Sequence, residues 1–220
     1  LEGLFARRVE RFTLDNGLTV LHTRDVSAKL VSAQVWVKTG SIHEGPFTGA
    51  GLSHYLEHML FKGTGNRKGT AISDEVQAAG GNINAYTTFD RTVYHIDGAA
   101  EAVGIFLDVL ADICFHSRLP AEEVAKEHDV ILREIDMGLD DPDRRVSRTA
   151  FEAAFLVHPY RHPVIGHREV FESVTEKDLR SYYEARYAPN NAVLVIVGDV
   201  TAEHVRKLAK KHFAGLAMRR

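Results

Sequence analysis

The sequence predicts an α+β fold in which one mainly antiparallel, mixed sheet packs against helices, all within a single domain over residues 1–220. Size and composition support this: 220 residues, 45% hydrophobic and 26% charged, are typical of a globular domain that buries roughly 70% of its unfolded surface. Stretches with strand-like alternation are interleaved with stretches of helical spacing, without a strict strand-helix-strand order. No repeat, low-complexity segment or linker divides the chain.

The amino-terminal part is predicted to form a β-hairpin followed by a third strand. Apolar and polar residues alternate over residues 9–14 and again over residues 18–22. The Asn16-Gly17 pair between them is a strong hairpin turn signal. Residues 30–39 are rich in β-branched side chains and predict the third strand.

The middle of the chain is predicted to contain two helices and two more strands. A glycine-rich loop over residues 45–51 leads into a helix that reaches about residue 62, because its apolar residues recur at helical spacing. A short helix over residues 71–79 ends at a pair of glycines. Residues 82–89 and 92–97 suit two strands.

The second half is predicted to be mainly helical, with one further strand. Pro120 at a first helical turn, and threonines before two of the other segments, mark helix starts. Residues 191–200 are continuously apolar, which is typical of a strand covered on both faces. Trp36 and Tyr94 are expected in the core. The helices are expected over residues 99–116, 120–137, 143–156, 175–187 and 201–213.

Charge and hydropathy exclude several classes of function. The chain has 27 Lys and Arg against 30 Asp and Glu, a formal net charge of −3, so we expect no nucleic-acid partner and no anionic membrane partner. The longest apolar run, residues 192–197, is much shorter than the roughly 18 residues of a transmembrane helix. Cys114 is the single cysteine, which excludes an internal disulfide, and its apolar surroundings predict a buried side chain.

The sharpest chemical feature is the segment His54-Tyr55-Leu56-Glu57-His58. On a helix, residues four apart lie on one face, so His54 and His58 can present two imidazoles to one metal ion with Glu57 beside them. Such a pair needs at least one more protein ligand to form a catalytic zinc site. A chance occurrence of this pattern is the competing interpretation.

The helix predicted over residues 120–137 offers candidate carboxylates. Glu127 and Glu134 are seven residues apart, hence two turns apart on one face, which also carries Ile131 and Ile135. Each carboxylate is either solvated at the edge of this apolar face or paired with another group. The histidine pair favours ligation.

These motifs resemble a known family, the inverted-motif zinc peptidases that include pitrilysin, insulin-degrading enzyme and mitochondrial processing peptidase. The segment over residues 39–64 carries the resemblance most strongly, because it contains the His-x-x-Glu-His pattern within Gly-Leu-Ser-His-Tyr-Leu-Glu-His-Met-Leu-Phe-Lys-Gly-Thr. Glu134, 76 residues after His58, matches the third ligand position of the family. The likeness continues over residues 80–87, 91–94, 187–191 and 197–200.

The resemblance implies the roles of the site residues. It makes His54, His58 and Glu134 the ligands of one Zn²⁺ per chain, and Glu57 the general base of a peptide hydrolysis. Two histidines and one carboxylate leave an open zinc position for water, which agrees with this chemistry. We assign Glu127 to orienting the site, with a purely structural role as the alternative.

The resemblance also implies a mode of substrate binding. The segment over residues 82–88, with Asn84, Ala85 and Thr87, is expected to be an edge strand onto which an extended or unfolded polypeptide adds by main-chain hydrogen bonds. An ordinary interior strand is the alternative. Phe61 is expected to line a pocket beside the scissile bond or, equally, to be a core residue.

Members of this family are built from pairs of such domains, and the second one closes the chamber. We therefore expect a missing carboxy-terminal half-domain or partner subunit, a dimer in the full-length protein, and weak or no peptidase activity from these 220 residues alone. The alternative function is that of a non-catalytic structural or assembly subunit with the same fold. A cytoplasmic setting is expected, with the periplasm and the mitochondrial matrix as alternatives.

The remaining histidines are expected to be surface or loop-packing residues. His158, His162 and His167 lie close together in sequence, in a loop-like stretch, and a second metal site there is the less favoured interpretation.

Overall fold

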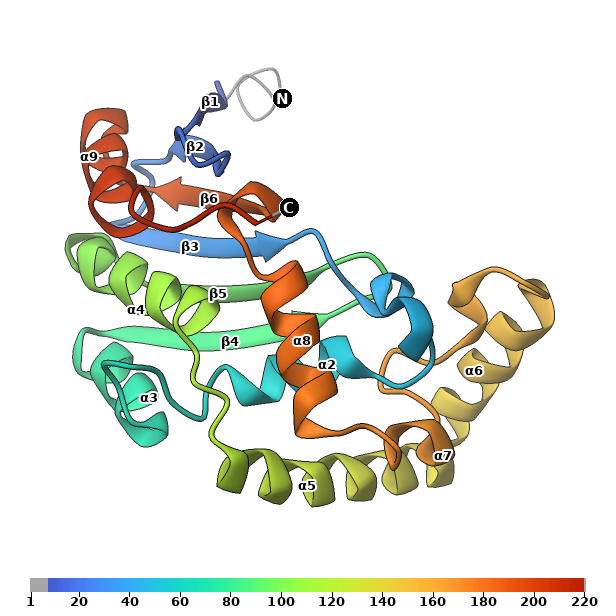
Figure 1. Cartoon of the computed structure of the whole chain (residues 1–220). Coiled ribbons are helices and arrows are strands. Elements are labelled where there is room, and N and C mark those ends of the chain that lie inside the picture. Colours follow the sequence, from blue (N-terminus) through green and yellow to red (C-terminus); the bar gives the residue numbers. More distant parts are fainter. Residues whose placement is uncertain (1–7, 220) are drawn as a thin grey trace.

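One six-stranded sheet organises the computed structural model, which describes residues 8–219 (Figure 1). The strand order is β1-β2-β6-β3-β5-β4, and every neighbouring pair is antiparallel except β2 and β6, which are parallel. The α+β class with a mainly antiparallel, mixed sheet is therefore confirmed. The strands are β1 (Glu10–Thr13), β2 (Thr19–Arg24), β3 (Leu30–Val37), β4 (Gly81–Thr87), β5 (Thr92–Ala99) and β6 (Ala192–Gly198).

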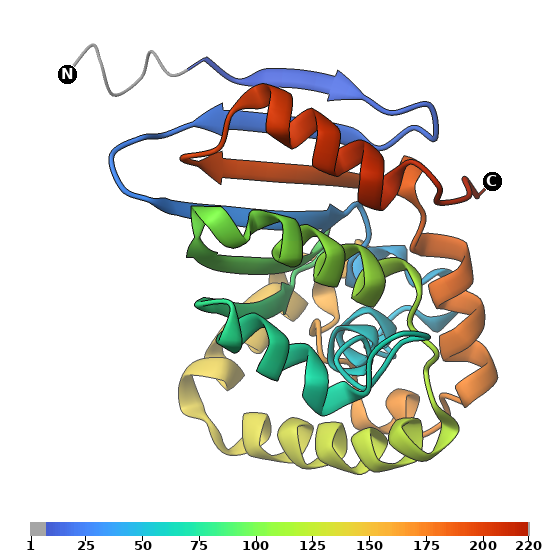
Figure 2. The same cartoon turned by 90° about the vertical axis from the view of Figure 1, so that its left-hand side faces the viewer.

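The helices pack against one face and one end of this sheet. Helices α3, α4 and α9 lie side by side over the strands in Figure 2, and α2 contacts β4 and β5. The long helix α5 passes beneath α2 and α8 in Figure 1. The helices are α2 (Leu52–Met59), α3 (Gly69–Ala78), α4 (Val103–Phe115), α5 (Ala121–Asp140), α6 (Pro142–Ala154), α7 (Arg168–Phe171), α8 (Glu176–Arg186) and α9 (Ala202–Phe213).

The predicted local signals for turns and helix starts are found where expected. The chain turns between β1 and β2 at Asn16-Gly17, where Gly17 takes a positive φ of 82° that favours glycine. Thr175 and Thr201 each accept a backbone hydrogen bond at the start of α8 and α9, as helix caps do. Cys114 is fully buried, as predicted. None of the helices in residues 8–219 is both long and apolar enough to span a membrane.

The two faces of the sheet differ in burial. Along β3, Val31, Ala33, Val35 and Val37 are buried, whereas the residues between them are only half-buried. Tyr94 belongs to the covered face and is fully buried, as predicted. The prediction that Trp36 is a core residue is wrong, because the alternation of side chains along a strand places its ring on the open face.

Strand β6 shows the same asymmetry. Leu194 and Ile196 are buried against the helices, but Val193 and Val195 are half-buried and Val197 is 38% exposed. The prediction that this strand is covered on both faces is therefore wrong for the described residues. A continuous apolar run shows that both faces of a strand carry apolar side chains. It does not show whether other elements pack on both faces of the sheet.

Candidate metal centre

Helix α2 presents the two histidines, and its start is held by a buried carboxylate. Gly51 precedes the helix with φ 75° and ψ 25°, and a Cβ there would meet the Ile165 carbonyl oxygen at 2.1 Å, so only glycine fits. The Glu44 carboxylate accepts hydrogen bonds from the backbone N–H groups of Gly51 and Ser53, each at 3.0 Å. These bonds satisfy N–H groups that a helix start leaves unpaired.

The third member of the cluster comes from α5. Glu134 Oε2 lies 3.8 Å from His54 Nε2 and 3.7 Å from His58 Nε2. These separations are too long for hydrogen bonds, but they are close to the roughly 3.3 Å between two ligands of a tetrahedral zinc ion. One donor atom from each of the three side chains lies within 4.8 Å of the others. The donor set therefore fits a zinc ion.

Burial keeps the first imidazole in the form that binds metal. Desolvation, with a smaller contribution from the neighbouring His58, lowers the pKa of His54 to about 3. His54 is thus neutral near pH 7 and has a lone pair for a ligand. Its Nδ1 is buried and has no hydrogen-bond partner.

Glu127 contacts the second imidazole. Its Oε1 lies 2.8 Å from His58 Nδ1, and its Oε2 lies 2.5 Å from Lys62 Nζ. Burial by itself would raise the pKa of Glu127, but the contacts with Lys62 and His58 outweigh it and the net shift is downward. An ionised Glu127 that accepts the Nδ1 proton leaves His58 Nε2 free to face Glu134.

Glu57 lies between α2 and the edge strand β4. The Thr87 hydroxyl donates a hydrogen bond of 2.5 Å to Glu57 Oε2. Desolvation raises the pKa of Glu57, since this carboxylate is half-buried and has no cationic partner as close as Lys62 is to Glu127. Thr87, expected to bind substrate, is thus placed in contact with the carboxylate expected to act as base.

The other expected substrate-binding residues lie nearby. Strand β4 is at the edge of the sheet, as predicted. Asn84 is exposed, and its Oδ1 accepts a 2.8 Å hydrogen bond from the Ala85 backbone N–H, which therefore does not pair with β5. Phe61 is half-buried and packs against the core. The centroid of its ring lies 6.2 Å from the centroid of the Tyr94 ring.

The second histidine cluster is organised by hydrogen bonds. His162 Nδ1 lies 2.9 Å from His167 Nε2, and the Arg148 guanidinium lies 3.0 Å from His167 Nδ1. A neighbouring cation disfavours a metal ion. Within residues 8–219, the cluster of His54, His58 and Glu134 is the only group of three or more such side chains whose donor atoms converge in this way.

The comparison with protein families decides the relationship. Residues 19–168 match the family model described as Insulinase (Peptidase family M16), and residues 173–219 match the model described as Peptidase M16 inactive domain. The chain belongs to peptidase family M16. The resemblance to the pitrilysin and processing-peptidase family is therefore confirmed.

Relatives of this M16 chain include proteins named as zinc proteases. An uncharacterized zinc protease of Bacillus subtilis, YmxG, is 33% identical over 202 residues, which cover 92% of this chain and 49% of the relative. The β subunit of the mitochondrial-processing peptidase of Lentinula edodes is 36% identical over 208 residues, which cover 93% of this chain and 44% of that subunit. The chain spans about half the length of these curated relatives.

A solved structure agrees with the M16 fold. The crystal structure of a protease from Helicobacter pylori superposes with a TM-score of 0.92 at 30% sequence identity. The match covers 97% of this chain and 52% of the other. The whole architecture described above is therefore shared, and a further part of the other chain lies outside the match.

Two residues of this M16 site were missed by sequence reasoning. Glu44 lies before the loop that leads into α2. The sequence does not show that this loop folds back and brings the Glu44 carboxylate to the backbone N–H groups at the helix start. Lys62 follows the histidine helix directly, yet its pairing with Glu127 depends on the packing of α5 against α2. The sequence offered one signal here, a glycine directly before the helix. Gly51 has a positive φ, a backbone conformation that favours glycine.

Proposed function

We propose that this chain carries the catalytic half of a zinc metalloendopeptidase that hydrolyses unfolded polypeptides or oligopeptides. The convergence of His54, His58 and Glu134 donor atoms, which lie within 4.8 Å of one another without hydrogen bonds among them, is the observation that carries the proposal. A zinc ion held by these residues would polarise the peptide carbonyl and lower the pKa of a bound water toward about 7. The zinc-protease names of M16 relatives support the same metal.

Glu57 is proposed as the general base. Thr87 donates to its Oε2, which orients the carboxylate, and the other oxygen makes no hydrogen bond within residues 8–219. The burial that raises the pKa of Glu57 makes it a better proton acceptor than a solvated carboxylate. Glu57 can therefore take a proton from the attacking water and deliver it to the leaving amine.

Glu127 is proposed as a positioning residue. It holds the Nδ1 side of His58 and is itself neutralised by Lys62, so it directs the other ring nitrogen toward the metal position. Partners of this kind fix the tautomer of a histidine ligand and raise its basicity.

The edge of β4 is proposed as the substrate platform. The Ala85 N–H is turned away from β5 and bonds only to the Asn84 side chain, which a peptide carbonyl can replace. Thr87, on the same strand, contacts Glu57, so a peptide added to this edge passes the proposed base. Because the peptide is recognised through its main chain, we expect this edge to accept substrates of many different sequences.

A second half is proposed to complete the enzyme. The relatives extend to about twice the matched length, and one of them is named as a subunit, which supports a following half-domain or a partner subunit and a dimer. These 220 residues alone are accordingly predicted to bind zinc with little hydrolysis. The cytoplasmic setting stays a prediction of the sequence.

The test compares Glu57→Gln with wild type in the protein that contains both halves. We expect about one zinc per chain in both proteins, and a loss of peptide hydrolysis of at least about 100-fold in the variant, as for removal of a general base. Glu203→Gln makes the same change on the exposed face of α9 and should leave activity intact. Less than half an equivalent of zinc together with no hydrolysis by wild type would favour the non-catalytic subunit instead. Unchanged hydrolysis in Glu57→Gln would contradict Glu57 as the general base.

The edge strand is tested separately with Ala85→Pro. Because the Ala85 N–H does not pair with β5, proline there removes only the donor offered to substrate. We expect weaker peptide binding with unchanged zinc content, whereas Ala85→Val, which keeps the N–H, should bind normally. Equal loss of zinc and peptide would indicate misfolding, and normal binding by Ala85→Pro would contradict the platform.

A further inference from the structure

The position of Glu134 depends on how α5 is held against the rest of the chain. Over its 20 residues this helix buries only four side chains, which lie on one stripe: Val124, Glu127, Ile131 and Ile135. Three of them are aliphatic, and apolar packing is not directional, so it does not fix where a helix lies along its own axis. A slip of one residue moves a helix by about 1.5 Å, whereas metal ligands tolerate only about 0.2 Å. Zinc binding by Glu134 therefore depends on directional contacts to α5.

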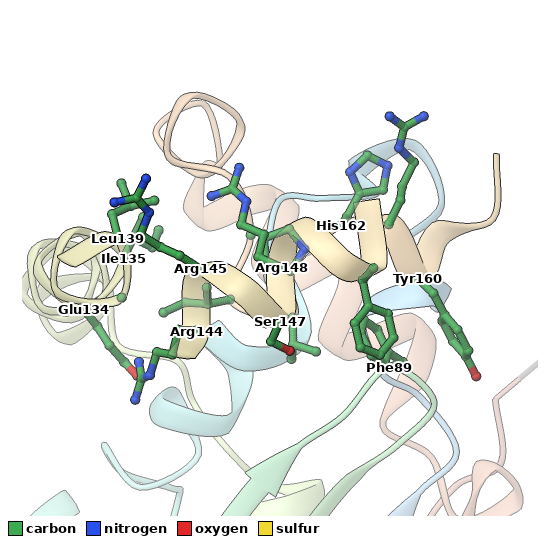
Figure 3. A pocket seen from close by; sticks show the side chains of 17 residues that line it. Phe89, Glu134, Ile135, Leu139, Arg144, Arg145, Ser147, Arg148, Tyr160 and His162 are labelled. Atoms are coloured by element: carbon green, nitrogen blue, oxygen red, sulfur yellow. The ribbon is translucent and has the colours of Figure 1, made fainter. Parts of the chain in front are cut away.

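Helix α6 gives the second half of α5 little support. None of the residues of α6 is buried, and a pocket of about 340 Å³ lies between it and the second half of α5 (Figure 3). Figure 3 shows Glu134, Ile135 and Leu139 on the side of α5 that faces this pocket. Asp136 contacts Arg168 of α7 at 2.6 Å, but both side chains are exposed, and exposed ion pairs contribute little. The position of Glu134 therefore depends on contacts that the first half of α5 makes.

Tyr55 makes such a contact. It lies inside the His-x-x-Glu-His pattern, and the catalytic steps proposed above do not use it. Its hydroxyl donates a hydrogen bond of 2.6 Å to the backbone carbonyl of Val124, in the first turn of α5. Tyr55 is only 1% exposed, so water does not compete for this bond. A hydrogen bond is directional, and a buried hydroxyl left without a partner costs free energy, so the contact defines a position along α5.

Neighbouring rings hold the Tyr55 side chain in place. The centroid of its ring lies 5.2 Å from that of Phe171 on α7. The His128 ring of α5 stacks on the same Phe171 ring, with 4.8 Å between centroids and 20° between the planes. Packing from α5 and α7 thus restricts the rotamer of Tyr55. Because Tyr55 and the two imidazoles belong to one helix, its hydroxyl is held at a fixed point relative to His54 and His58.

We propose that Tyr55 is a positioning residue of the metal centre, whose hydroxyl holds the backbone of α5 so that Glu134 meets the two imidazoles. The inference rests on the proposed function, because it requires that His54, His58 and Glu134 bind zinc. This role differs from that of Glu127, which contacts His58 Nδ1 and acts on the orientation of that ring. Tyr55 acts on the helix that carries the third ligand.

The test measures zinc affinity by competition with a chelator in the protein that contains both halves. Tyr55→Phe keeps the ring and removes only the hydroxyl, and we expect it to bind zinc about 3- to 10-fold more weakly, the change that corresponds to one hydrogen bond. Tyr183→Phe is the matched control, because the buried Tyr183 hydroxyl also donates to a helix carbonyl, that of Cys114 on α4, at 3.1 Å. This control should bind zinc as tightly as wild type, even if it lowers stability by the same amount. Equal affinities of Tyr55→Phe and wild type, or equal losses in both variants, would overturn the inference.

A double-mutant cycle tests whether the effect of Tyr55 passes through Glu134. In the Glu134→Gln background, Tyr55→Phe should cause little further loss of affinity, because the two residues act as one unit. A loss of the same size in both backgrounds would mean that Tyr55 acts on α2 alone, and would overturn the inference. The visible absorption of Co²⁺ bound in place of zinc depends on its coordination geometry. It should change in Tyr55→Phe and not in Tyr183→Phe, and an unchanged spectrum in Tyr55→Phe would overturn the inference as well.

The same measurements distinguish failure of this inference from failure of the proposed function. A wild type that binds no zinc would contradict both. A wild type that binds zinc and hydrolyses peptides, with the same zinc affinity in Tyr55→Phe, would contradict only the positioning role of Tyr55.

Discussion

Two clusters of ionisable side chains differ in how their charges are paired. The first is the metal cluster of His54 and His58 on α2 and Glu134 on α5, and the second surrounds Arg67 in the loop after α2. In the second cluster, Arg67 forms short contacts with three carboxylates: 2.7 Å to Glu75, 2.5 Å to Asp108 and 2.9 Å to Asp112. Asp112 also accepts a 2.6 Å hydrogen bond from the Thr64 hydroxyl. All three guanidinium nitrogens of Arg67 donate hydrogen bonds to these carboxylates, and the cluster ties α3 and α4 to the loop after α2.

In the metal cluster of His54, His58 and Glu134, only His58 has such a close partner, Glu127 at 2.8 Å from its Nδ1. Glu134 stands 3.7 to 3.8 Å from the two imidazoles, and His54 Nδ1 is buried without a partner. Burial that is compensated by internal pairing stabilises a fold, whereas converging donors that are not paired are available for a ligand. The distances between atoms thus distinguish the paired Arg67 cluster from the proposed metal-binding cluster.

The largest effect is expected on breaking the structural cluster with Arg67→Met. Asp112 is only 3% exposed, so removal of the guanidinium strands a buried charge. We expect a loss of about 3–5 kcal/mol in unfolding free energy, measured by urea denaturation. Arg24→Met breaks a single exposed contact to Asp199 at 3.4 Å and should cost less than about 1 kcal/mol. Equal effects of the two changes would remove the distinction between the clusters.

Glu44 is a third kind of buried acidic group, because backbone N–H groups hold its carboxylate, whereas Arg67 holds that of Asp112. Burial raises the pKa of Glu44 from 4.5 to about 7. The folded protein then holds a proton that the unfolded chain has already lost above about pH 5, so stability falls as the pH rises toward 7 and beyond. This contribution amounts to as much as about 3 kcal/mol.

Glu44→Gln should therefore flatten the pH dependence of the unfolding free energy between about pH 5 and pH 8. The measurement is denaturant unfolding of both proteins over this range, and the difference between them isolates the Glu44 contribution. Glu203→Gln, at an exposed position, should leave the slope of wild type unchanged. A Glu44→Gln protein with the wild-type slope would show that this carboxylate stays ionised.

If His54, His58 and Glu134 bind zinc as proposed, metal addition should stabilise the folded protein through these residues and not through the Arg67 cluster. Zinc that binds only the folded chain at a free concentration of 100 Kd adds about 2.7 kcal/mol, and a chelator removes it. Differential scanning calorimetry should therefore show a rise in Tm with zinc, and this rise should be largely lost in Glu134→Gln. Glu75→Gln, from the Arg67 cluster, should keep it. A full zinc response in Glu134→Gln would exclude Glu134 as a ligand.

The smallest effect is expected from Glu127→Gln, which keeps the shape of the site but removes its second carboxylate charge. Loss of the charged partner of His58 should weaken zinc binding by about 10- to 100-fold, or about 1.4 to 2.7 kcal/mol, in competition with a chelator. Glu123→Gln, on the same helix with a contact to Lys126, is the matched control. Identical zinc affinities in the two variants would contradict the positioning role of Glu127 and favour a purely structural role.

Short-range patterns in the sequence were sufficient for much of the fold. The Asn16-Gly17 turn and the caps at Thr175 and Thr201 act within a few residues, so local chemistry specifies them. The placement of His54 and His58 on one face also follows from helix geometry alone. The edge position of β4 is different, because it came from the family resemblance and not from periodicity.

What only the tertiary structure decided depends on contacts between residues far apart in the chain. The sequence alone does not show that α5 packs against α2, which sets the distance from Glu134 to the imidazoles and pairs Lys62 with Glu127. Hydrophobicity predicted β6 as a strand, yet the packing of helices on one side left Val197 exposed. Periodicity along a chain specifies which side chains share a face, but the packing of elements determines what that face meets.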